Sequence, residues 1–187
     1  MTREELYRSL DDVNHSREKR AEMSDFVLGR PETVRHLVDI AFEVDDPISN
    51  RACWVMEFAA KEDLSYILPF VDELTENLGR VHLDSSVRPL AKICEYLVEA
   101  YFAKTPNPTQ KTLTDIHLKR ITEACFDWLI GDHKVAAKAY SMTCLLLLGK
   151  KFEWIHPELK MILERNYASG SAAYKARARR TLSKLKF

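Results

Sequence analysis

The sequence GDHKVAAKAYSMTCLLLLGKK, residues Gly131–Lys151, has the form of one complete helix. It begins with Asp132, a residue type that commonly caps helix N-termini, and ends at Gly149, a type that commonly follows helix C-termini. Apolar residues recur between these ends at helical spacing. The stretches DSSVRPLAKICEYL (84–97) and DDPISNRACWVMEFAA (45–60) have the same order of cap, apolar residue and alanine. The pattern therefore predicts a helical unit that is repeated along the chain.

Five copies of the unit can be aligned on a polar residue of N-cap type. These residues are Asn14, Asp45, Asp84, Asp132 and Ser171. At one fixed position after the cap, every copy has an alanine: Ala21, Ala52, Ala91, Ala139 and Ala178. A small side chain at a fixed place lets a neighbouring helix approach closely. The spacing between copies leaves room for two helices each, so we expect stacked helix pairs; a plain bundle whose helices all use alanine is the alternative.

Helical periodicity covers nearly the whole chain, and no segment has a competing strand pattern. The expected helices are about 2–12, 15–29, 31–44, 47–60, 64–78, 85–103, 111–130, 133–148, 157–168 and 172–186. Residues 104–110, KTPNPTQ, are expected to be an inserted loop. The predicted fold class is all-α.

The repeated phrase resembles the HEAT/armadillo repeat, whose pattern is Asp-x-x-Val-Arg-x-x-Ala. The closest copy has Asp84, Val87, Arg88 and Ala91. The copy at Asp132 has Ala136 where arginine is usual, and in the copy at Asp45 the basic residue is displaced to Arg51. The resemblance implies a right-handed α–α superhelix, a HEAT-like solenoid of about four to five helix pairs. One HEAT-like repeat domain is then expected over 1–187, with an N-terminal helix at 1–13, repeats over 14–168 and a C-terminal capping helix at 171–187.

Composition and charge indicate a cytoplasmic globular protein. The 187 residues include 28 basic and 28 acidic side chains, so a zero net charge gives no general attraction to nucleic acid or anionic membrane. The longest apolar run, MTCLLLLG, is too short to span a bilayer, and the N-terminus does not resemble a signal peptide. The four cysteines all lie in apolar runs, which is typical of buried thiols: Cys53, Cys94, Cys125 and Cys144.

No catalytic residue, metal site or cofactor site is predicted. The six histidines include no pair three or four residues apart, which is the spacing that would place two metal ligands on one helix face. The sequence has neither a glycine-rich phosphate loop nor a nucleophile motif. The chain is therefore not expected to be an enzyme.

The strongest charge signal is the basic C-terminal helix. Its cations are Lys175, Arg177, Arg179, Arg180, Lys184 and Lys186. One interpretation is a solvated capping helix whose cations favour the helix C-terminus. The other is a surface that binds phosphate groups or an acidic partner. Because acids concentrate in 32–76, the two ends of the chain are expected to differ in charge.

Two of the three tryptophans are candidate binding residues. Trp54 follows a repeat alanine and is expected in the core, whereas Trp128 and Trp154 fall near helix ends. These two are candidate aromatic residues of a ligand groove, with packing between repeats as the alternative.

The predicted function is a non-enzymatic scaffold or adaptor that binds a protein or peptide on the curved surface. Partner helices of each pair are expected to line that surface. The alternative is nucleic-acid binding, as in the HEAT-like alkylpurine DNA glycosylases, and Asp127-Trp128 beside Lys119-Arg120 is the local cluster that favours it.

Overall fold

The computed structural model describes residues 1–185, which form eleven α-helices and no β-strand. The helices are α1 (Arg3–Asp11), α2 (Arg17–Leu28), α3 (Val34–Ala41), α4 (Ser49–Glu62), α5 (Val71–Asn77), α6 (Asp84–Tyr101), α7 (Pro108–Thr112), α8 (Asp115–Ile130), α9 (Val135–Leu148), α10 (Ile155–Tyr167) and α11 (Ala172–Leu182). Short 3₁₀ turns lie at Pro31–Thr33, Leu64–Tyr66, Leu68–Phe70 and Leu78–Arg80. The predicted all-α class is confirmed.

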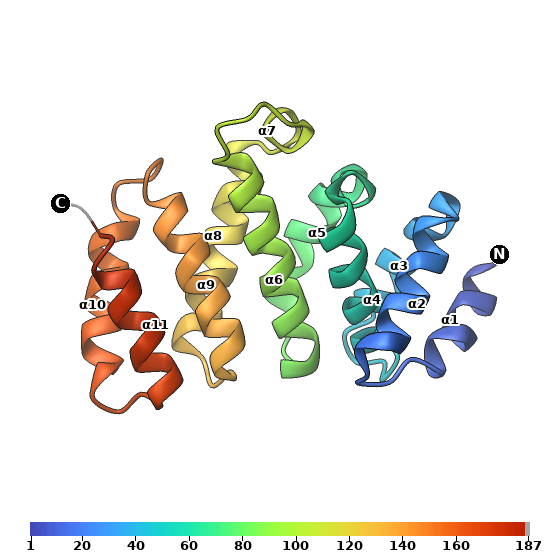
Figure 1. Cartoon of the computed structure of the whole chain (residues 1–187), viewed down its shortest axis with the longest axis horizontal. Coiled ribbons are helices and arrows are strands. Elements are labelled where there is room, and N and C mark those ends of the chain that lie inside the picture. The colour runs from blue at the N-terminus through green and yellow to red at the C-terminus, as the bar shows by residue number, and fades with distance from the viewer. Residues whose placement is uncertain (186–187) are drawn as a thin grey trace.

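The helices are arranged in two layers along the length of the molecule (Figure 1). We call α2, α4, α6, α9 and α11 the front layer; each of these helices packs against the next. We call α1, α3, α5, α8 and α10 the rear layer. Ion pairs of α5 link neighbouring rear helices, since Glu73 pairs with Arg35 of α3 and Glu76 with Arg120 of α8. The two ends of the chain lie at opposite ends of this row, an arrangement compatible with a helical repeat fold.

A single cluster of buried apolar side chains runs between the layers. Three of the five repeated alanines, Ala52, Ala91 and Ala178, are fully buried where front helices approach their neighbours. Ala21 and Ala139 are partly exposed. The small residue that α9 buries is Ala137. Close helix approach therefore uses the predicted alanine in α4, α6 and α11 and a different one in α9.

The predicted N-caps differ from the observed ones. Of the five aligned positions only Ser171 caps its helix, accepting a hydrogen bond from the Tyr174 N–H at 3.2 Å. Asp84 is the first residue of α6, and its Oδ1 accepts a hydrogen bond from the backbone N–H of Lys134 at 3.4 Å. Lys134 is the N-cap residue of α9, and Asp132 lies outside that helix. The aspartate of one unit thus contacts the start of the next front helix.

Prolines explain several differences in helix boundaries. The expected helix over 64–78 is replaced by two 3₁₀ turns and α5, because Pro69 cannot donate a backbone hydrogen bond. Within the expected loop 104–110, Pro108 begins α7, which Asn107 caps. The helix expected to start at Pro157 begins two residues earlier, at Ile155, because proline is tolerated in a first helical turn.

Pro89 lies inside α6, where it removes one backbone hydrogen bond. The lost donor would have bonded to the carbonyl oxygen of Ser85, four residues earlier. In its place, the indole N–H of Trp54 on α4 donates to that oxygen at 2.7 Å. The helix defect is therefore satisfied by the neighbouring front helix, and it links α4 to α6.

Candidate binding surface

Partly exposed aromatic rings and cations alternate across four helices of the front layer. The Arg20 guanidinium of α2 lies 4.9 Å from the centre of the Phe58 ring on α4. Further along, Lys92 Nζ of α6 lies 4.6 Å from the Tyr96 ring and 4.8 Å from the Tyr140 ring of α9. Such cation–π contacts hold long side chains in fixed positions. The front layer therefore presents an ordered row of charged and aromatic groups.

Two acids beneath this row are almost completely buried. Glu57, with 8% exposure, accepts two hydrogen bonds from Arg88, at 2.6 and 3.2 Å. Glu95, with 5% exposure, forms an ion pair with Lys92. Burial raises the pKa of nearby Glu99, and the charge of Glu95 raises it further. The acids therefore fix the cations from below, while the cations and rings reach the surface.

A cavity of about 300 Å³ opens between the starts of α2, α6 and α9. Its charged lining consists of three cations, Arg20, Arg88 and Lys134, and one carboxylate, Asp84. Trp54 and His15 form an aromatic wall, with ring centres 4.8 Å apart. The cavity therefore combines cations with aromatic surface at one end of the row.

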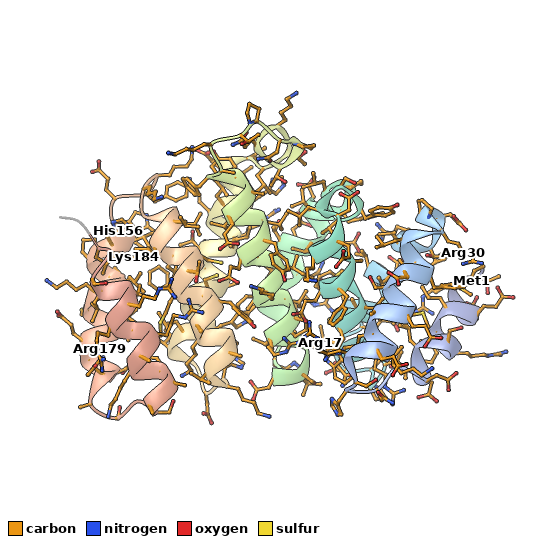
Figure 2. The ribbon with its side chains drawn as sticks, in the orientation of Figure 1. Met1, Arg17, Arg30, His156, Arg179 and Lys184 are labelled. Carbon is orange, nitrogen blue, oxygen red and sulfur yellow. The ribbon has the colours of Figure 1, made fainter. Side chains whose placement is uncertain are left out.

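The predicted cations of the C-terminal helix lie elsewhere. Lys175 and Arg177 are partly exposed, and Arg179, Arg180 and Lys184 are exposed, whereas Lys186 lies outside the described residues. Both Nε and Nη2 of Arg179 donate hydrogen bonds to the Tyr167 hydroxyl, at 3.2 and 3.1 Å. Figure 2 shows Arg179 on α11 and Lys184 just after it, separated along the molecule from Arg17 at the start of α2. These cations therefore form a group apart from the cavity.

The two candidate groove tryptophans occupy different environments. Trp128 is 2% exposed and packs in the core instead of lining a groove. Trp154 is 56% exposed and stacks on Phe126 of α8, with ring centres 5.7 Å apart. Trp128 is buried because the helical spacing of apolar residues in α8 places it on the same face as the buried Leu118 and Ile121.

The local cluster that favoured nucleic-acid binding is divided between surface and core. Asp127 and Lys119 are exposed on α8, whereas the adjacent Trp128 faces inward. Arg120 is paired with Glu76 of α5 at 2.8 Å. This part of the rear layer therefore offers little free positive charge to a phosphate backbone.

The cysteines are buried, as predicted, and all four are free thiols. Burial raises the pKa of Cys53 to about 12, and it raises the pKa values of Cys94 and Cys144 well above the ordinary thiol value. Buried thiols with raised pKa values are weak nucleophiles and weak metal ligands. Among residues 1–185, no three His, Cys, Asp or Glu side chains are grouped so that they could hold a metal ion.

The front-layer groups were not singled out from the sequence, although one signal pointed to them. Ala136, which replaces the usual repeat arginine, lines the cavity. Arg20, Phe58 and Tyr140 lie far apart in the sequence, and only the stacking of the helices brings them to one face. The departure from the repeat phrase is therefore the feature by which sequence reasoning could have located the cavity.

Comparison of the chain with protein-family models, with curated proteins and with solved structures finds no match. Within residues 1–185, no helix is long and apolar enough to cross a membrane. Function is therefore inferred from the geometry of the front layer.

Proposed function

We propose that this chain is a HEAT-like repeat protein that acts as a non-enzymatic interaction module. Its ligand is an acidic segment of a partner protein, bound along the front layer. This differs from the expectation that the partner helices of each pair form the binding surface, because the ordered row lies on the helices that begin each repeat.

The observation that carries the proposal is the row of rings and cations from Arg20 to Tyr140. Aromatic and arginine side chains contribute most strongly to protein interfaces, since they bury a large area with little loss of side-chain freedom. Contacts with neighbouring helices already hold these side chains, so binding an extended segment costs little additional ordering. Cations at the surface favour acidic residues in that segment.

The same row supports a peptide over a nucleic acid. A nucleic-acid backbone requires a continuous track of unpaired cations, because each phosphate carries a charge. On the front layer, Arg88 and Lys92 are each paired with a buried glutamate, and Glu99 is exposed beside them. Cations separated by aromatic rings match an acidic peptide that also carries apolar side chains better than they match a uniform polyanion.

Selection from a displayed library of random peptides tests the proposal. We expect wild-type protein to enrich peptides rich in Asp and Glu. The selected peptides are then titrated against the variant Tyr96→Ala/Tyr140→Ala. This variant should bind roughly thirtyfold to several hundredfold more weakly, because each of the two rings is expected to contribute about 1–2 kcal/mol at the interface.

The rear-layer variant Phe126→Ala/Trp154→Ala is the matched control, since it too removes two aromatic rings, which here stack on each other. It should retain wild-type affinity. Thermal unfolding of both variants establishes that they are folded. The proposal fails if no acidic peptide is enriched, or if front and rear variants lose the same affinity.

A further inference from the structure

The cavity at the start of α2, α6 and α9 has more positive charge than its own carboxylates neutralise. Among residues 1–185, Arg20 and Lys134 form no ion pair. Arg20 is held by hydrogen bonds from Nε to the Ser16 carbonyl oxygen at 3.2 Å and from Nη2 to the His15 carbonyl oxygen at 3.1 Å. The guanidinium is thus fixed by neutral acceptors, and its charge is left for a ligand.

The two carboxylates close to the cavity are occupied in holding its walls. Glu57 accepts two hydrogen bonds from Arg88. Asp84 Oδ1 lies 2.9 Å from His133 Nδ1 and also accepts from the Lys134 N–H. Arg88 uses two of its five N–H groups on Glu57, so the others remain for a further acceptor.

The electrostatic environment of Arg20 agrees with an excess of cations over carboxylates at the cavity. Burial lowers the pKa of Arg20, and the positive charge of Arg88 lowers it further; the charge of Glu57 opposes this in part, and Arg17 makes a smaller lowering contribution. Neighbouring cations that repel one another are stabilised by an anion bound between them. The guanidinium nevertheless stays charged at neutral pH, because its ordinary pKa is very high.

The cavity exists because α9 departs from the repeat. In α6 the repeat arginine, Arg88, reaches across to Glu57 on the preceding front helix. In α9 the equivalent residue is Ala136, which is too short to cross to α6 and which lines the cavity together with Ala137. The start of α9 also has no side-chain cap. One missing arginine therefore opens a recess between two front helices.

The size of the recess limits what can enter it. A volume of about 300 Å³ is at the lower end of ligand pockets, enough for one modified side chain and too small for a large ligand. The three cations Arg20, Arg88 and Lys134 exceed what a single carboxylate needs. A phosphomonoester has a charge of about −1.5 to −2 and three strong acceptor oxygens, which suits three separate donors.

We infer that this cavity receives the phosphoryl group of a phosphorylated side chain in the bound segment, an inference that rests on the proposed function. The cations bind the phosphate oxygens, and Trp54 and His15 contact the apolar part of the side chain. The rest of the segment continues along the row toward Tyr140. Phosphorylation of the partner would then control its affinity.

The first test titrates inorganic phosphate at constant ionic strength and follows the indole N–H signal of Trp54 by NMR, identified with the variant Trp54→Phe. We expect saturable shifts of this signal and of the backbone N–H signals of Ala136 and Ala137. Shifts that increase without saturation, or that map to α11 instead, would overturn the inference.

The second test compares degenerate acidic peptides centred on phosphoserine with the same peptides containing serine. We expect the phosphorylated peptides to bind roughly tenfold more tightly or better. This preference should fall below about twofold in Arg20→Gln/Lys134→Gln, because those cations supply it. The control Lys104→Gln/Lys119→Gln has the same change in charge at exposed positions and should keep the full preference.

The outcomes separate the inference from the proposed function. If acidic peptides bind through Tyr96 and Tyr140 but phosphorylation gives no gain, the cavity inference is wrong and the proposed function stands. If no acidic peptide binds the front layer, the proposed function itself fails. If short duplex DNA displaces the phosphopeptide at lower concentration than unlabelled phosphopeptide does, the site binds nucleic acid and the inference is overturned.

Discussion

At the scale of single residues, the hydrogen bond from Trp54 to the Ser85 carbonyl shows how a defect in one helix can fix a side chain of the neighbouring helix. Pro89 leaves that carbonyl without its helical donor, and the indole N–H replaces the donor from another helix. A proline at position 89, inside the expected helix 85–103, implies by itself that one backbone donor is missing. The sequence did not show which side chain would satisfy the freed carbonyl, because that depends on the packing of α4 against α6.

The first prediction concerns this hydrogen bond. Trp54→Phe should destabilise the protein by about 1–3 kcal/mol, since it leaves the part-buried Ser85 carbonyl without a donor. In the background Pro89→Ala, which restores the backbone N–H, the same change should cost clearly less. Urea unfolding of the four proteins in a double-mutant cycle measures the difference. Equal costs in both backgrounds would show that the two residues act independently.

The second prediction concerns the buried thiols. Burial keeps Cys53 protonated in the folded state up to a pKa of about 12, whereas an unfolded thiol has a pKa of about 8.5. Above pH 8.5 the unfolded chain releases this proton and the folded chain does not, so stability should fall as pH rises. The slope contributed by each such thiol approaches about 1.4 kcal/mol per pH unit.

Urea unfolding between pH 7.5 and 9.5 measures this slope. The variant Cys53→Ala should show a shallower decline than wild type, because it lacks one titrating thiol. An identical decline in both proteins would contradict the assigned pKa. Cys94 and Cys144 keep part of the effect in the variant, since their pKa values are raised by burial as well.

At the scale of helices, Asp84 has a different role from the one its sequence position suggests. The third prediction is that Asp84→Ala destabilises the protein by about 0.5–1.5 kcal/mol, the usual contribution of a hydrogen bond, and increases hydrogen exchange at the Lys134 amide just before α9. These effects follow from the loss of the acceptor for Lys134 and the contact with His133.

Asp132→Ala provides the control, because Asp132 was the predicted cap of α9 but lies outside that helix. It should leave both stability and exchange nearly unchanged. If Asp132→Ala costs as much as Asp84→Ala, the observed assignment of the two aspartates is reversed.

The ends of a helix could be predicted where they depend on hydrogen bonds within the same turn, and could not be predicted where they depend on residues far away in the sequence. Ser171 was predicted correctly, since a serine hydroxyl bonds within its own turn. Asp84 was misassigned because its partner comes from a residue 50 positions away. Pro69 lies inside the expected helix 64–78, where a proline removes a backbone donor, but its consequence, a pair of 3₁₀ turns, depends on how the segment packs. Local signals therefore located the helices and the Ser171 cap but misplaced the other four caps, and partners distant in sequence were not visible.

At the scale of the whole molecule, each front helix is stabilised mainly by the front helices on either side of it. The fourth prediction is that native-state hydrogen exchange shows graded stability, with α6 and α9 most protected and α1 and α11 least protected. End units have one neighbour each, so they lose less buried surface when they open. Uniform protection across all helices would indicate a single cooperative globule instead.

The candidate site could be predicted only in part at this scale. Repeated alanines and helical spacing were sufficient to predict stacking, since they belong to every copy. The binding row combines residues of four copies, and each of them looks like an ordinary surface residue in its own copy. The C-terminal cations could be predicted as a candidate binding surface because they are close together in the sequence. Arg20 and Lys134, in contrast, come together only in the folded chain.

The joints between front helices differ in the number of bonds that reinforce them. Trp54, Arg88 and Asn50 all form hydrogen bonds between α4 and α6. In the part of the chain that the structure describes, no side-chain hydrogen bond joins the helical residues of α2 to those of α4, of α6 to those of α9 or of α9 to those of α11. Stiffness is therefore uneven, and the α4–α6 pair should behave as a rigid centre while bending is shared among the joints on either side of it. A ligand segment that crosses from α2 to α9 would then have to span flexible joints on both sides of this centre, so its binding should reduce the bending of the whole row.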